Sequence, residues 1–167
     1  MFVLFTVLSL FLIACNGDDK PTDETNTKNQ EVKEKSSVSD TTLDTGDYVY
    51  EIKDIEQVVG KEDMNILAVE VEFTNKSDEP KSPWMAGELF AEQETETTVE
   101  LLNGALGMFP DDYKPELTEM GDTNVKPGAT VDAVIGYEIL YPGNPVRLYN
   151  FMYDENPLFE RVVETEE

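Results

Sequence analysis

The sequence contains no histidine and only one cysteine among its 167 residues. Without histidine, the chain cannot form a Ser-His-Asp triad, a Cys-His pair or a histidine-ligated zinc site. A single cysteine excludes an internal disulfide and a cysteine cluster for zinc or an iron–sulfur centre. We therefore expect no catalytic residues, no metal site and no cofactor, and we expect that the protein is not an enzyme.

Basic residues are also scarce, with 12 Lys and Arg against 36 Asp and Glu and a formal net charge of −24. Such a chain repels nucleic acid phosphates and anionic membrane surfaces. The charge therefore excludes a nucleic acid partner and favours a protein partner with a basic surface. The length predicts one domain with appendages rather than two domains.

The first fourteen residues, 1–14, carry no charge and consist mainly of Phe, Val, Leu and Ile. A helix that spans a bilayer needs about 17–25 apolar residues, so this run is too short to cross one. Its length is typical of the apolar part of a signal peptide. No Lys or Arg precedes Lys20, whereas signal peptides open with a basic segment. We therefore expect the true start of translation to lie upstream of Met1.

The residues that follow this run resemble the lipobox of bacterial lipoproteins. They are Leu12, Ile13, Ala14 and Cys15. The resemblance implies that signal peptidase cuts between Ala14 and Cys15 and that the Cys15 thiol carries a diacylglycerol. The protein would then be held by acyl chains on the outer face of the cytoplasmic membrane, exposed to the cell wall or the extracellular space. The alternative is an ordinary buried cysteine after a secretory leader.

A polar segment comes next, and with the lipidated cysteine it makes up residues 15–46. It contains no aromatic residue, and beyond Cys15 its large apolar side chains are only Val32, Val38 and Leu43. So few apolar side chains cannot offset the entropy lost on ordering the chain, which predicts a disordered tether. About thirty flexible residues separate their ends by roughly 30 Å. The competing interpretation is a recognition or phosphorylation tail.

Residues 47–167 have the pattern of an all-β domain. The clearest strand alternates Leu67, Val69, Val71 and Phe73 with more polar neighbours. Similar signals predict strands at 48–53, 84–93, 97–102, 131–140, 146–153 and 158–163. A long loop with one helical turn near residues 116–120 is expected between 103 and 122. About seven strands favour an immunoglobulin-like β-sandwich that lacks the disulfide of that fold.

The strand at residues 68–73, with the turn that follows it up to Trp84, resembles an uncharacterised domain of Gram-positive lipoproteins. The segment from Lys126 to Thr130, leading into the Tyr137 strand, carries the same resemblance. That family is similar to telokin-like and immunoglobulin-like extracellular domains, which include immunoprotective antigens. The resemblance implies a β-sandwich on a lipid anchor, and it assigns no catalytic residue.

Four kinds of residue are candidates for a site. Trp84, the only tryptophan, is either an aromatic anchor for a partner or part of the core. Asp111, Asp112 and Asp122 are the best place for calcium, although the spacing of a calcium-binding loop is missing. Paired carboxylates for glycoside hydrolysis would need to face each other in a cleft, which sequence cannot show.

An aromatic strip is the last candidate. Tyr149, Phe151 and Tyr153 would share one face of a strand, with Tyr137 and Tyr141 nearby. An exposed strip could bind a glycan or a peptide, and a buried one would be a wall of the core. The sequence thus predicts a membrane-anchored surface lipoprotein whose non-catalytic sandwich binds a protein or assists an envelope complex. The alternative is an extracellular module that binds a glycan, a peptide or a metal ion such as calcium.

Overall fold

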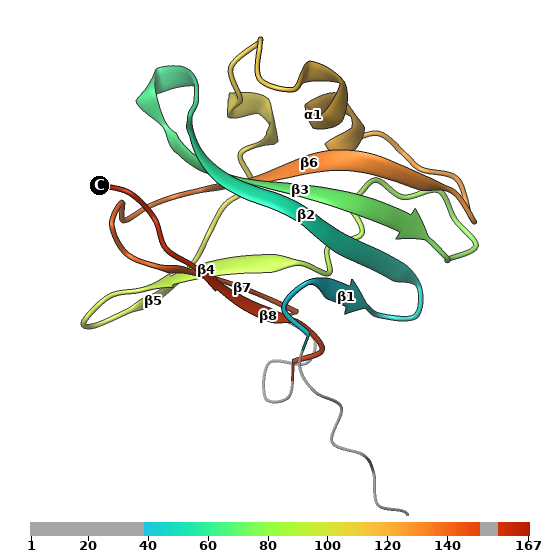
Figure 1. Ribbon diagram of the computed structural model, residues 1–167, viewed down its shortest axis with the longest axis horizontal. Helices are drawn as coiled ribbons and strands as arrows, with labels where there is room; N and C mark the ends of the chain where they lie inside the picture. The colour runs from blue at the N-terminus through green and yellow to red at the C-terminus, as the bar shows by residue number, and fades with distance from the viewer. Residues whose placement is uncertain (1–38, 151–156) are drawn as a thin grey trace, which may run out of the picture. The chain divides into compact units, whose positions relative to one another are not determined.

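A computed structural model describes residues 39–150 and 157–167, which form two antiparallel sheets of four strands each (Figure 1). The first sheet has the order β1 (Thr42–Asp44), β2 (Tyr48–Val59), β3 (Asn65–Asn75), β6 (Thr130–Glu138). The second has the order β5 (Val99–Leu101), β4 (Phe90–Glu94), β7 (Val146–Tyr149), β8 (Glu160–Val163). The predicted β-sandwich is therefore confirmed, with eight strands in place of about seven.

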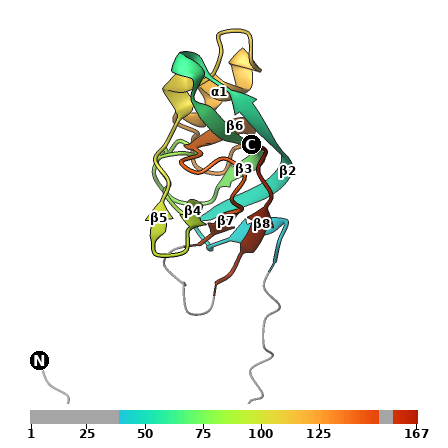
Figure 2. The same ribbon diagram turned by 90° about the vertical axis from the view of Figure 1, so that its left-hand side faces the viewer.

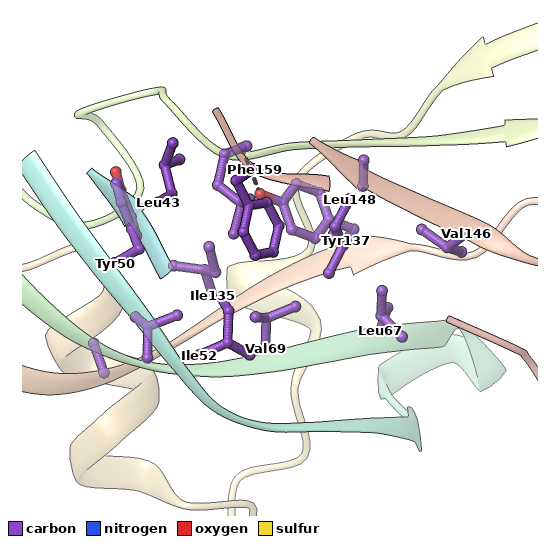
Figure 3. Close-up of a cluster of buried hydrophobic side chains, with 14 of the residues drawn as sticks. Leu43, Tyr50, Ile52, Leu67, Val69, Ile135, Tyr137, Val146, Leu148 and Phe159 are labelled. Atoms are coloured by element: carbon purple, nitrogen blue, oxygen red, sulfur yellow. Dashed lines mark hydrogen bonds between the residues drawn. The ribbon is translucent and has the colours of Figure 1, made fainter. Parts of the chain in front are cut away.

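The main core lies between the two sheets, where side chains from both layers meet (Figure 3). Strand β3 supplies the predicted alternating residues, and all four are buried: Leu67, Val69, Val71 and Phe73. Two tyrosines within this core donate hydrogen bonds to the segment before β4. The Tyr50 hydroxyl lies 2.7 Å from the Pro83 carbonyl, and the Tyr137 hydroxyl lies 2.6 Å from the Leu89 carbonyl.

The outer face of the first sheet is covered rather than exposed (Figures 1 and 2). Its cover consists of η1 (Lys61–Asp63), η2 (Leu106–Met108) and α1 (Pro115–Gly121). Ile66, Ala68 and Val134 are buried beneath it, together with Phe109. The expected helical turn in the 103–122 loop is confirmed. Strand β3 is thus buried on both faces near its start, which the alternating pattern did not predict for Ala68.

The boundary predicted between tether and domain, at residues 46 and 47, is too late. Strand β1 pairs with β2, and its Leu43 is fully buried in the core. Ser39 already forms a parallel bridge with Phe159 beside the second sheet. Burial of Leu43, pairing with the neighbouring strand β2 and the bridge to Phe159 order a segment whose composition is polar. Residues 15–38, with Cys15 and most of the predicted tether, lie outside the described residues, as does the leader.

The strand predicted at 84–93 begins only at Phe90, because residues 82–87 form a tight turn. The buried Ser82 hydroxyl accepts a hydrogen bond from the Met85 amide at 3.1 Å, and its carbonyl accepts one from the Ala86 amide at 3.0 Å. Strand β7 ends at Tyr149, and residues 151–153 of the predicted strand lie outside the described residues. Within the described part of the chain, no helix is long and apolar enough to span a membrane.

Candidate functional site

The outward face of the second sheet carries exposed apolar side chains in register with charged ones. Residues paired across antiparallel strands share a face, so Leu101, Glu92, Arg147 and Val162 form one row across all four strands. In that row Leu101 is 53% exposed and Val162 is 60% exposed. Val99, also 60% exposed, lies on the same face one row along. Large apolar side chains are therefore exposed to solvent at both edges of this sheet.

Arg147 lies at the centre of this face and is held by two carboxylates. Its Nε donates to Glu160 Oε1 at 2.7 Å, and its Nη1 donates to Glu92 Oε1 at 2.9 Å. The guanidinium also lies over the Tyr149 ring, 4.4 Å from its centroid. Burial disfavours the charge, but both carboxylates outweigh it and raise the Arg147 pKa. The cation is thus neutralised in place, and the group as a whole stays acidic.

The rest of this region is strongly acidic. Between Trp84 and Tyr113 the sequence has no Lys or Arg, while Glu92, Glu94 and Glu96 follow each other along the β4–β5 hairpin. A shallow depression of about 360 Å³ lies beside Arg147 and is lined by Glu92, Glu94, Pro145 and Val162. The face therefore combines apolar contact area with negative charge.

A second hollow, of about 400 Å³, lies where the chain passes from β5 to the first sheet. Its lining is largely apolar and includes Trp84, Met85, Phe90, Leu102 and Tyr137. The Trp84 and Tyr137 rings are 5.6 Å apart at their centroids, and Met85 is 60% exposed. This Trp84 hollow has the size and lining of a small ligand site.

The sequence matches one protein family, described as a "Domain of unknown function (DUF5067)", over residues 23–149. The chain belongs to this family. The matched residues extend from the predicted tether through β7, so they contain both sheets except β8. A comparison with curated protein sequences gives no significant match.

The DUF5067 chain also resembles solved structures. One is a "putative lipoprotein" from Staphylococcus aureus, with 21% identity, 77% of this chain and 90% of that chain covered, and a TM-score of 0.63. A protein from Enterococcus faecalis, solved by NMR, has 15% identity, 78% and 95% coverage and a TM-score of 0.63. A "putative lipoprotein" from Bacillus subtilis has 15% identity, 77% and 40% coverage and a TM-score of 0.50. At these identities the likeness shows a shared fold. The link to telokin-like domains stays a prediction.

Trp84 of the DUF5067 domain packs against the core, as one of the two interpretations made from the sequence expects. Its ring packs against the main core, and its amide donates to the Gly121 carbonyl at 3.0 Å. The ring also lines the hollow, so it is only partly buried. The role of an aromatic anchor for a partner stays a prediction.

The acidic residues proposed for calcium are not brought together. Asp111 forms an ion pair with Lys61, with 2.8 Å between the Nζ and a carboxylate oxygen, and this hydrogen bond lowers the Asp111 pKa. Among the described residues, no group of three or more His, Cys, Asp or Glu is arranged to hold a metal ion. The loop carrying Asp112 and Asp122 therefore offers no cluster of oxygen ligands.

The predicted aromatic strip is divided between different environments. Tyr137 and Tyr149 are buried, at 2% and 3% exposure, while Tyr141 is 37% exposed in the turn that follows β6. Phe151 and Tyr153 lie outside the described residues. Tyr137 belongs to the main core, which agrees with the interpretation as a wall of the core. Tyr149 is buried on the outward face of the second sheet, beneath the Arg147 guanidinium.

Sequence analysis did not predict two groups of charged side chains that the structure brings together. Lys114 bridges Glu56 and Glu70, with nitrogen–oxygen distances of 2.9 and 2.8 Å, and Tyr113 donates to Glu56 at 2.7 Å. This group fastens the start of α1 to β2 and β3. The other is the Arg147 group. Both join residues far apart in sequence, and only the strand register reveals such neighbours.

Proposed function

We propose that the protein is a membrane-anchored lipoprotein of the cell surface whose β-sandwich binds a protein partner with a basic surface. The lipobox-like residues ending at Cys15 support the anchor. The names of the similar structures from Staphylococcus aureus and Bacillus subtilis support it as well. Two acyl chains hold a protein on a bilayer stably, so a chain of charge −24 needs no electrostatic attraction to lipid.

The observation that carries the binding function is the outward face of the second sheet. Val99 and Leu101 expose apolar area at the β5 edge and Val162 does so at the β8 edge, with Glu92 and Arg147 between them. Exposed apolar side chains rimmed by polar ones are typical of interaction sites. The surrounding carboxylates favour a partner that brings Lys or Arg, because complementary charge speeds association and selects partners. Arg147 does not weaken this preference, since two glutamates neutralise it.

Three carboxylates of the domain are held in the charged form by hydrogen bonds from lysine. Among the described residues, each carboxylate with a displaced pKa has it lowered, and the first cause is a hydrogen bond from lysine. Asp44 is bonded by Lys76 and Glu56 by Lys114. A carboxyl group that donates a proton in catalysis needs a raised pKa instead. We therefore propose a non-catalytic role as a binding protein or an accessory of an envelope complex.

Site-specific crosslinking on intact cells tests this proposal. A photo-reactive amino acid would replace Leu101 in one strain and Val162 in another. Val59 provides a matched control, because it is 60% exposed like Val162 but lies at the end of β2 in the first sheet. Irradiated products would be separated by mass and their partner identified by peptide mass spectrometry.

We expect a crosslinked product of one defined mass from positions 101 and 162 and none from position 59. The crosslinked partner should carry a basic surface region. Equal crosslinking at all three positions, or crosslinking at position 59 alone, would contradict the assignment of the second sheet. Separation of the same cells into membrane and soluble fractions tests the membrane anchor. The anchor and the binding face can therefore be refuted independently.

A further inference from the structure

We infer that the partner adds an extended basic segment to the free edge of β5 and places an apolar side chain in the Trp84 hollow. This inference rests on the proposed function, because it specifies how the second sheet receives its partner. It follows from four features of the edge: its free main-chain groups, its alternating side chains, its charge and its position beside the hollow.

Within the part of the chain that the structure describes, β5 is an edge strand whose outward main-chain groups have no hydrogen-bond partner. The hydrogen bonds Thr95 N–Thr98 O and Leu102 N–Ala91 O, both 2.8 Å, fix the register of the β4–β5 hairpin. In an antiparallel ladder, bonded and non-bonded pairs alternate. Residues 98, 100 and 102 therefore turn their N–H and C=O groups toward β4. Those of Val99 and Leu101 turn outward, where an added strand can pair with them.

The side chains of β5 alternate in a way that selects an alternating partner. Val99 and Leu101 lie on the outward face, whereas Glu100 pairs with the buried Gln93 and so points to the opposite face. Neighbours across a β-ladder share a face. A strand added beside β5 would therefore place apolar side chains next to Val99 and Leu101 and a basic one next to Glu100.

Charge decides against a second copy of this chain as the occupant. A charged residue that points inward on a short edge strand normally blocks pairing between edges. Two β5 edges would bring Glu100 of each copy together, and each chain carries a net charge of −24. A segment with lysine or arginine removes this obstacle. Glu100 thus disfavours self-association and favours a basic partner.

The Trp84 hollow begins where β5 ends. Leu102 and Asn103, the next residues after β5, line it together with Phe90 from β4. A segment that pairs with Leu101 consequently runs along the rim of the hollow. The apolar lining and the volume of about 400 Å³ suit one aromatic side chain stacked against Trp84. Main-chain pairing would supply affinity, and the hollow would supply specificity.

A synthetic peptide can test this inference on the purified full chain. The probe is a ten-residue peptide in which lysine alternates with valine and one central valine is replaced by phenylalanine. Trp84 is the only tryptophan in the sequence, so its fluorescence reports directly on the hollow. We expect saturable binding and a shift of the Trp84 emission. A control peptide of identical composition, with lysines and apolar residues in two separate blocks, should bind at least tenfold more weakly.

Two substitutions of one residue separate main-chain pairing from side-chain contact. Leu101→Ala removes the side chain and keeps the outward N–H, whereas Leu101→Pro also removes that N–H. Proline is tolerated at this position of an edge strand because no bond to β4 is lost. We expect Leu101→Pro to bind the alternating peptide about tenfold more weakly than Leu101→Ala. The circular dichroism of both variants should match that of the wild type.

Equal binding by the two variants, or by the two peptides, would overturn strand addition. The crosslinks at positions 101 and 162 would then still uphold contact through the outward face, so the two proposals fail separately. A concentration-dependent dimer in sedimentation experiments would indicate that a second copy of this chain, and not a basic partner, occupies the β5 edge. That result would overturn the inference. A shift of Trp84 emission with soluble cell-wall glycan and none with the peptide would also overturn it.

Discussion

The indole ring of Trp84 lies so close to the backbone of Gly104 that a Cβ on Gly104 would overlap the ring. Because residue 104 is glycine, the backbone after β5 can pack against one side of the Trp84 ring. The Tyr137 ring packs against another side. The hollow beside the ring exists because these three residues hold its wall in place. The fold and the candidate site thus depend on the same contact.

Replacement of Gly104 by alanine should push the Trp84 ring from its position. We expect a loss of about 1–3 kcal/mol in the free energy of unfolding, as for other overpacked sites. Urea unfolding would measure it, and Trp84 emission at zero denaturant should shift. Gly107 is a matched control, because a Cβ there would meet no atom within 4 Å. A Gly107→Ala variant as unstable as Gly104→Ala would contradict this explanation.

Local patterns were enough to predict much of the fold. The alternation from Leu67 to Phe73 predicted β3, and dense turn residues such as Pro142 to Pro145 located the ends of other strands. Strand β1 was not predicted, because its only large apolar residue is Leu43, which is surrounded by Thr, Asp and Gly. Its order comes from the hairpin with β2 and from the burial of Leu43 in the core, and the core contacts are not visible in a local window.

The candidate site was harder to predict than the fold, because its parts are distant in sequence. Arg147 meets Glu92 across 55 positions. The Trp84 ring meets Gly104 through a loop that crosses between the sheets. Sequence analysis singled out Trp84 as a candidate, and its ring lines the hollow. The hollow also depends on the backbone of Gly104, a residue type that carries no chemical signal in the sequence.

Leu43 should be essential to stability although it lies in a segment of polar composition. It is fully buried, and replacement of a buried leucine by alanine costs about 2–5 kcal/mol. Leu43→Ala should lower the urea midpoint accordingly. The control is Leu140→Ala, because Leu140 is 37% exposed and should lose much less. Limited proteolysis should leave a core that begins near Ser39, and a stable core beginning at residue 47 would contradict the role of β1.

Lys114 should make stability depend on pH in the acidic range. Its hydrogen bond lowers the Glu56 pKa below the ordinary 4.5, so the folded state gains stability above that pH and loses it on acidification. The glutamates raise the Lys114 pKa, so its own contribution is present below pH 10.5 and is lost only at higher pH. Both contributions are therefore complete near neutral pH.

The Lys114→Met variant should lose this dependence in part. We expect its melting temperature to fall less than that of the wild type when the pH is lowered from 7 to 3. Lys126→Met is the control, since Lys126 is exposed and forms no ion pair among the described residues. A pH dependence that is unchanged in Lys114→Met would show that the Lys114 pairs do not couple protonation to folding.

The backbone of Lys114 predicts a difference between two further substitutions. Its φ of 36° lies in the left-handed region, where a side chain costs about 1 kcal/mol relative to glycine. Lys114→Gly and Lys114→Ala lose the same ion pairs, so their comparison isolates the backbone. Lys114→Gly should be the more stable by about 1 kcal/mol in urea unfolding. At Lys126, where φ is not positive, alanine should be the more stable, and the same order at both positions would refute the argument.

Cys15→Ala should abolish the membrane anchor without affecting the folded domain, whose described residues begin at Ser39. Cells of a Gram-positive host would be grown with a clickable fatty acid and then fractionated. We expect the wild type and the neighbouring variant Asn16→Ala to be labelled and to remain with membranes, and Cys15→Ala to be unlabelled. Because acyl chains and not charges provide the attachment, a wash at high salt should release none of the wild type. A labelled Cys15→Ala protein, or release of the wild type by salt alone, would refute lipidation as the anchor.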